Sequence, residues 1–197
     1  MRSSSLTAVV VFTALTGSAF AQSPPPAVSV PAPPPTVTAP PIVPGAPVTA
    51  LTDRDANFIS AQLENNRAEV AAAQLALQRS QNPTVRNFAE KMITDHNYAQ
   101  NTLDPIASLH RIAPPPTPTA AHQAMLDRLS QLNGTAFDRA YVSFVVSDQA
   151  QDVSEFNTEL PLVVNGRVSA WTQNIRPMLL QHQEIAQQLL TSLPPSG

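Results

Sequence analysis

The chain has 197 residues, 21 prolines, no cysteine and a formal net charge of -3 at pH 7. The lack of cysteine excludes a disulfide framework, a thiolate metal site, an iron–sulfur cluster and a cysteine nucleophile. The small negative charge provides no electrostatic footprint for nucleic acid or for an anionic membrane surface, so we expect no nucleic-acid partner. The length suits one domain, and the uneven distribution of proline indicates that part of the chain lies outside it.

Residues 1–21 are typical of a secretory signal peptide. Arg2 precedes an apolar run, and the stretch closes with the small-residue sequence Ala19-Phe20-Ala21. This order predicts cleavage near Ala21, which would leave the mature chain in the periplasm or outside the cell. The apolar run is too short for a ~30 Å hydrocarbon core, so we expect no transmembrane span in the mature chain. The alternatives are association with the cell envelope and retention of the segment as an anchor.

Residues 22–50 predict a disordered, proline-rich tether. They contain 11 prolines and no charged residue. Proline removes an N–H donor and restricts φ, which leaves the extended polyproline conformation rather than helix or strand. We interpret this segment as a spacer. The alternative is a ligand for an envelope protein or a cell-wall partner.

Residues 51–193 predict one helical domain, followed by a short tail at 194–197. Apolar residues recur in steps of three and four, which is typical of helices packed in a bundle, and the period-2 alternation of a sheet is lacking. Asn82-Pro83 is a typical helix start, and the prolines at 113–118 and the pair Asn133-Gly134 are breaks. The expected helices cover about 53–80, 82–106, 119–132, 135–160 and 168–193. Four long helices and one short crossover helix imply an all-α four-helix bundle.

Two histidines, His96 and His182, occupy the centres of the apolar stripes of the second and fifth helices. Burial of an imidazole costs free energy unless it gains a hydrogen-bond partner or a metal. One interpretation is a metal or proton-relay site with Glu69, which lies toward the rim of its own stripe. The other is a pair of neutral histidines bonded to Asn66, to Gln149 or to each other.

A di-iron carboxylate centre is not expected, because it needs Glu-x-x-His pairs. Ile93 and Leu179 stand three residues before the two histidines. Two imidazoles with one carboxylate therefore leave at best a mononuclear site. The sequence also lacks nucleophile motifs and a phosphate-binding glycine loop, so an enzyme is not favoured.

The fourth expected helix carries a row of acidic residues at i, i+4, i+7 and i+11: Asp148, Asp152, Glu155 and Glu159. This spacing places them on one helix face. We interpret the row as the solvent-facing side of an amphipathic helix. A site that collects calcium or basic peptides is the alternative.

Several motifs resemble a bacterial envelope family known as domain of unknown function 4142, often labelled "predicted outer membrane protein". In the first half these are Glu69, the run Leu75–Ser80, the run Val85–Met92 and Asp95-His96. In the second half they are the run Gly134–Tyr141 and the pair Pro177 and His182. Their order and spacing agree over about residues 53–190. The resemblance implies a secreted or periplasmic, ferritin-like bundle of unestablished activity.

One position departs from the family pattern. Members usually carry Asp-His-Gln in the middle of the fourth helix, whereas this chain has Asp148-Gln149-Ala150. If the family binds a metal through Glu69, His96, that histidine and His182, then this chain has lost one ligand, since an amide is a poorer transition-metal ligand than imidazole.

The sequence therefore favours an exported, non-enzymatic helical bundle with a structural, stress-related or interaction role in the envelope. The alternative is a mononuclear metal-binding or redox protein that holds a single transition-metal ion with Glu69, His96 and His182.

Overall fold

A computed structural model describes residues 50–195, which form five helices and no strand. The helices are α1 (Asp53–Arg79), α2 (Pro83–Leu109), α3 (Ala120–Ser130), α4 (Gly134–Glu159) and α5 (Gly166–Ser192). The all-α prediction is confirmed, and the expected helices agree with these bounds to within about three residues. The expected signal peptide and nearly all of the tether lie outside the described residues.

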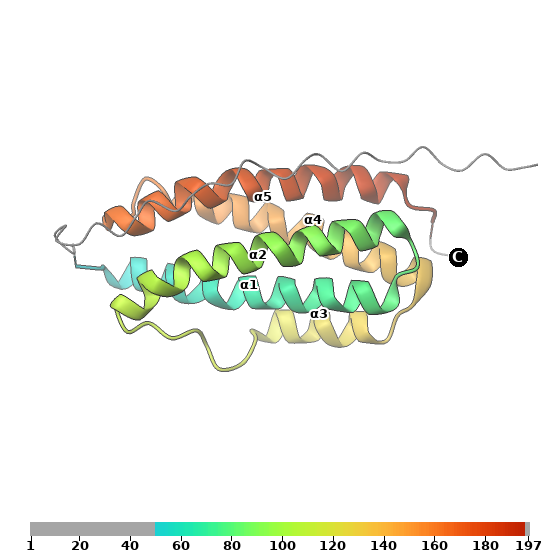
Figure 1. The fold of residues 1–197 in the computed structure, drawn as a ribbon, viewed down its shortest axis with the longest axis horizontal. Helices are drawn as coiled ribbons and strands as arrows, with labels where there is room; N and C mark the ends of the chain where they lie inside the picture. The colour runs from blue at the N-terminus through green and yellow to red at the C-terminus, as the bar shows by residue number, and fades with distance from the viewer. Residues whose placement is uncertain (1–49, 196–197) are drawn as a thin grey trace, which may run out of the picture.

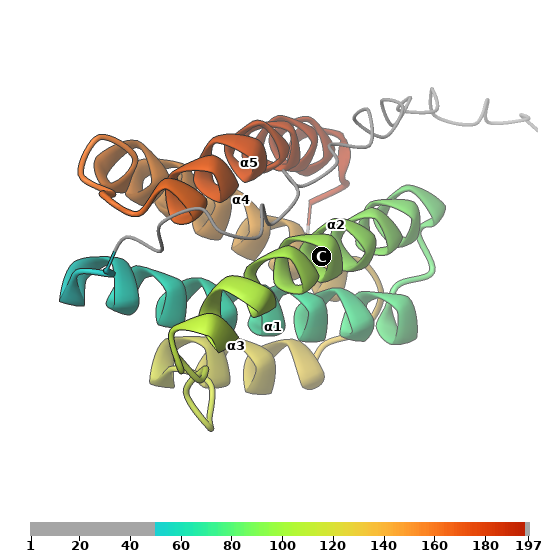
Figure 2. The same cartoon turned by 60° about the vertical axis from the view of Figure 1, so that its left-hand side comes forward.

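The four long helices form a bundle of two antiparallel hairpins, α1 with α2 and α4 with α5 (Figure 1). The loop after α2 and the short helix α3 lead the chain back along the bundle, so that α2 and α4 run in the same direction. One long crossover of this kind is the connection found in ferritin-like folds. Helix α3 packs on the outside against α1 and α4 (Figure 2).

Side-chain caps define where three of the long helices begin. Thr52 accepts a hydrogen bond from Asp55 N, and the Asp55 side chain accepts one from Thr52 N, which is a capping box. Asn82 and Asn165 each accept from two backbone N–H groups in the first turn of α2 and α5. These bonds satisfy donors that have no partner inside the helix.

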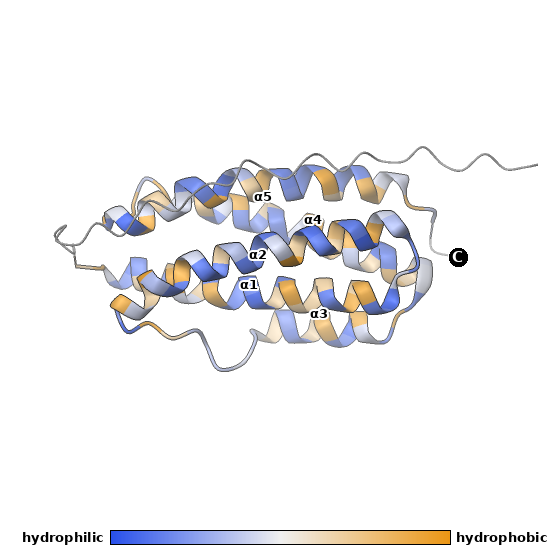
Figure 3. Ribbon diagram, viewed as in Figure 1, coloured by the Kyte–Doolittle hydropathy of each residue, from blue (hydrophilic) through white to orange (hydrophobic). Residues whose placement is uncertain are grey.

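The apolar faces of the helices divide into two hydrophobic clusters along the bundle, and each helix mixes hydrophobic and hydrophilic residues along its length (Figure 3). The first cluster lies at the α1–α2 turn and includes Phe88, Met92 and Tyr141. The second lies toward the opposite end, where Phe58, Phe156 and Trp171 have ring centroids 5.4–6.3 Å apart.

None of the helices within residues 50–195 is long and apolar enough to cross a membrane.

Candidate functional site

A layer of buried polar side chains separates the two hydrophobic clusters. We call it the polar layer, and each long helix contributes to it: Asn66 and Glu69 from α1, His96 from α2, Gln149 from α4 and His182 from α5. All five residues are buried, and both histidines are no more than 1% exposed. Polar groups in such a place need partners, because burial without hydrogen bonds costs free energy.

His96 is held by two side chains of α1. Its Nδ1 lies 2.9 Å from Asn66 Oδ1, and its Nε2 lies 2.8 Å from Glu69 Oε2. A carbonyl oxygen can only accept, so Nδ1 carries the hydrogen and Nε2 of the neutral ring accepts. Burial lowers the pKa of His96 to about 4. Burial, followed by the charge of Asp148, raises the pKa of Glu69 well above its usual value. The proton between Glu69 and His96 therefore belongs to Glu69.

His182 is bonded to α2 rather than to Glu69. Its Nε2 lies 2.7 Å from Asp95 Oδ2, which is also 2.8 Å from Lys91 Nζ. The Asp95 pKa is lowered, because the hydrogen bonds from His182 and Lys91 together outweigh the effect of burial. Burial lowers the pKa of His182 to about 4, so the ring is neutral and donates through Nε2. Its Nδ1 then keeps a lone pair, and this buried atom has no hydrogen-bond partner in the part of the chain that the structure describes.

The two imidazoles lie next to each other, with ring centroids 5.2 Å apart and planes tilted by 40°. Gln149 completes the layer: its Nε2 donates to Glu69 Oε1 at 2.5 Å and lies 3.4 Å from His96 Nε2. The sequence-based hypothesis of bonds from the histidines to Asn66 and Gln149 therefore applies to His96. The partner of His182 is Asp95, which the sequence places only toward the rim of its helix.

A group of three carboxylates adjoins the polar layer. One oxygen each from Glu69, Asp148 and Asp152 lies within 4.8 Å of the others. Burial raises the pKa of Asp152 well above its usual value, and the charges of Glu69 and Asp148 add to this effect. Asp152 Oδ2 accepts a hydrogen bond of 2.6 Å from Asn65 Nδ2.

The interpretation of the α4 acidic row as a solvent-facing side was wrong. Asp152 is buried, while Asp148 and Glu159 are only 13% and 15% exposed at their side chains. The reason is packing: Asn65 and Arg54 of α1 bond Asp152 and Glu159, and His122 of α3 faces Asp148. The sequence interpretation treated the row as part of an isolated amphipathic helix and did not account for the crossover helix.

His122 links α3 to the carboxylates. Its Nδ1 lies 2.9 Å from Glu64 Oε1, and its Nε2 lies 3.5 Å from Asp148 Oδ1. Asp148 in the first place, and Glu64 in addition, raise the pKa of His122 to about 9, so that the ring is a cation at neutral pH. Nothing in the spacing of α3 indicated this role.

The structure thus brings Glu69 into contact with His96 and places His182 beside His96. Among the described residues, the three side chains whose ligand atoms lie within 4.8 Å of one another are all carboxylates. His182 is not part of this group. Whether Glu69, His96 and His182 bind a metal stays a prediction. Sequence reasoning did not single out Asn65 and His122. It noted Asp152 only as a member of the acidic row, and Asp148 there and in the triplet Asp148-Gln149-Ala150.

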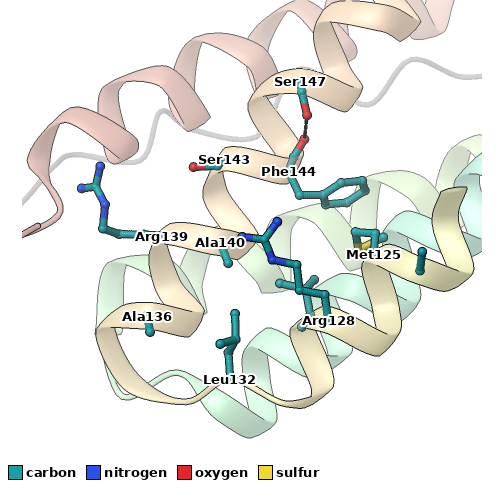
Figure 4. Close-up of a pocket in the computed structure, with 11 residues that line it drawn as sticks. Met125, Arg128, Leu132, Ala136, Arg139, Ala140, Ser143, Phe144 and Ser147 are labelled. Carbon is teal, nitrogen blue, oxygen red and sulfur yellow. Dashed lines mark hydrogen bonds between the residues drawn. The ribbon is translucent and has the colours of Figure 1, made fainter. Parts of the chain in front are cut away.

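A pocket of about 720 Å³ lies elsewhere, between α3 and α4 (Figure 4). Its wall includes Met125, Leu132 and Phe144, and Arg128 and Arg139 carry its positive charges. Arg139 donates to the carbonyl oxygen of Leu193, so it also ties α4 to the end of α5. No member of the polar layer lines this pocket.

The chain matches the family described as domain of unknown function (DUF4142) over residues 42–189. The chain belongs to the DUF4142 family. The resemblance seen in the sequence is confirmed for the family, whereas the match does not extend to the outer-membrane label. No curated protein matches this DUF4142 chain.

One solved structure is similar in fold, a DUF305 fragment from Deinococcus radiodurans. The superposition has a TM-score of 0.66, with 16% identity, and covers 73% of the DUF4142 chain and 99% of the fragment. At this identity the likeness supports the helical fold alone.

Proposed function

We propose that this protein is an exported, non-enzymatic helical bundle that has a structural, stress-related or interaction role in the bacterial cell envelope. The observation that carries the proposal is that the polar side chains between the four helices are buried and hydrogen-bonded to one another. His96 and His182 are no more than 1% exposed, and side chains of neighbouring helices engage them. A general base must come within hydrogen-bond reach of its substrate, and buried side chains block that approach here.

The order of residues in the first 50 positions supports export and a tethered domain. A charged, apolar and small-residue sequence precedes a proline-rich stretch, and such a stretch is suited to hold a folded domain away from its attachment point. An envelope protein or the cell wall is the partner class that fits this arrangement.

Export is tested by fractionation of cells that express the full chain, with mass spectrometry of the N-terminus. We expect a periplasmic or secreted chain that begins near residue 22. A chain retained in the cytoplasm with Met1 intact would overturn the proposal.

Deletion of residues 22–50 should impair localisation or partner capture and leave the helical circular dichroism spectrum unchanged. A normal location without the tether would argue against a role for it.

The second candidate function is the binding of one transition-metal ion by Glu69, His96 and His182. It is favoured by the 2.8 Å contact between Glu69 and His96, and by the unpartnered Nδ1 lone pair of His182. An imidazole nitrogen and a carboxylate oxygen suit zinc, copper or iron. Gln149, at the centre of the layer, stands at the position where the resemblance to the family leads us to expect an imidazole.

This candidate is tested by the metal content of the purified protein, prepared without chelator, beside a Gln149→His variant. One transition metal per natural chain, lost in His96→Ala or His182→Ala, would support it. A metal-free natural chain with a loaded variant would mean that this member lacks the site. If both are empty, the buried histidines are structural.

A further inference from the structure

The carboxylate group of α1 and α4 is a different feature from the histidine pair. Asp148 and Asp152 are four residues apart in α4 and therefore share one face, and Glu69 approaches them from the antiparallel helix α1. Glu69 and Asp152 are buried, and the Asp148 side chain is only 13% exposed. Three acidic side chains in so small a volume repel one another strongly unless protons or a cation reduce their charge.

The protein itself supplies few donors to these oxygens. Asn65 donates to Asp152 Oδ2, and Gln149 donates to Glu69 Oε1. The cationic side chain of His122 is closer to Glu64 at 2.9 Å than to Asp148 at 3.5 Å. The negative charge of the group is therefore only partly balanced from the side of α3.

Two buried acceptor atoms at the carboxylate group have no hydrogen-bond partner among residues 50–195. They are Asp148 Oδ2 and the side-chain carbonyl oxygen of Gln149, a residue with no solvent exposure. The Gln149 amide is held beside Glu69 by its Nε2 hydrogen bond of 2.5 Å, and its unpaired oxygen is bonded to the same amide carbon as that nitrogen, so it lies close to the carboxylate group. Buried acceptors are normally satisfied, and an ion is one of the accepted reasons for an exception. Both of these atoms are acceptors, so a cation that displaces the proton of Glu69 would satisfy them.

We infer that Glu69, Asp148 and Asp152, with the carbonyl oxygen of Gln149, bind one hard divalent cation between α1 and α4. Carboxylate and carbonyl oxygens are the ligands that Mg²⁺, Ca²⁺ and Mn²⁺ prefer, whereas imidazole suits zinc and copper. Of the three carboxylates, Asp148 is the one that keeps some exposure, 13% at its side chain, and it is the route by which solvent and a cation reach the site. This inference goes beyond the proposed function and does not depend on export or on the histidines.

The test is a titration of the purified, chelator-treated protein with Mn²⁺, in which free Mn²⁺ is read from its electron paramagnetic resonance amplitude. We expect one Mn²⁺ per chain, with competition by Ca²⁺ or Mg²⁺. Asp148→Asn and Asp152→Asn keep side-chain shape and should weaken binding at least tenfold. The matched control is Glu155→Gln, which removes one negative charge from the same helix outside the group. Its side chain accepts a long bond of 3.4 Å from Gln62.

His182→Gln separates this site from the transition-metal candidate, since it should leave Mn²⁺ binding unchanged. Loss of binding in His182→Gln with retention in Asp148→Asn would overturn the inference in favour of the imidazole site. If Glu155→Gln weakened Mn²⁺ binding as much as the Asp variants do, the inference would be overturned in favour of non-specific attraction.

A second measurement needs no variant: about 1 mM Ca²⁺ should raise the thermal midpoint of the natural protein, because binding stabilises the folded state. Stoichiometric binding absent for all three ions would refute the site, whatever the outcome for export.

Discussion

His182 Nε2 lies 2.7 Å from Asp95 Oδ2, and this bond anchors an imidazole in the centre of the bundle to a carboxylate near the edge of α2. Asp95 also accepts from Lys91, one turn earlier on the same helix. The arrangement orients the ring and directs its unpartnered Nδ1 lone pair away from Asp95. A buried donor that loses its acceptor costs about 1–3 kcal/mol, so this bond is a measurable part of the stability.

We therefore expect Asp95→Ala to lower the free energy of unfolding by about 1–3 kcal/mol at pH 7. Asp95→Asn keeps a carbonyl acceptor for His182 Nε2 and should cost less. Urea denaturation of both variants provides the comparison. Equal stability of Asp95→Ala and the natural protein would mean that the bond to His182 contributes nothing.

The histidines should make stability depend on pH. The folded-state pKa of His182 is about 4, below the ordinary 6.5, so protons bind the unfolded chain more readily. The stabilising contribution of neutral His182 is present above pH 6.5 and is lost as the pH falls toward 4. Its slope reaches about 1.4 kcal/mol per pH unit for one proton.

The carboxylates act in the opposite sense. Glu69 and Asp152 have raised pKa values, so their contribution declines as the pH rises from the unfolded-state value. The effect of His182 is therefore measured by comparing the natural protein with His182→Gln. The free energy of unfolding of each is determined by denaturation at several pH values from pH 7 to pH 4.5, and the difference between the two proteins reports His182. A difference that does not change over this range would contradict a neutral buried ring. An NMR titration that gave a His182 midpoint near 6.5 would do the same.

Asp152→Asn should raise the stability of the metal-free protein at pH 7. The variant removes a buried carboxyl whose ionisation is opposed by burial and by Glu69 and Asp148. We expect a higher free energy of unfolding, because the amide of Asn carries no charge for burial and the neighbouring carboxylates to oppose. The thermal midpoint is the measurement. Glu155→Gln serves again as the control, and a lower midpoint in Asp152→Asn alone would contradict the expectation.

His122→Ala should loosen α3. His122 bonds Glu64 of α1 and faces Asp148 of α4, and α3 has only one well-buried apolar side chain, Leu129. Amide hydrogen exchange in residues 120–130 should become faster, while α1, α2 and α5 keep their protection. Gln123→Ala, a change at an exposed neighbour, should leave exchange unchanged. Uniformly faster exchange in all helices would mean that α3 is not a separate unit.

Much of the fold could be predicted from local spacing. The three- and four-residue steps identified five helices, and Asn82-Pro83 marked the start of α2 as the structure has it. The same spacing placed His96 and His182 at the centres of their stripes, and both are buried. Glu69 could be placed only at the rim of its stripe, although it is buried in the structure.

The sequence by itself determined the helices, the inward positions of the two histidines and the family. Only the tertiary structure decided that His182 bonds Asp95, that His96 bonds Asn66 and Glu69, and that the acidic row of α4 is covered. The physical reason is that helical periodicity specifies the angle of a side chain about its own axis. The rotation and register of each helix against its neighbours come from packing between distant segments. Helix α1, together with α3 at the edge, covers an acidic face of α4 that the spacing of α4 marked as exposed.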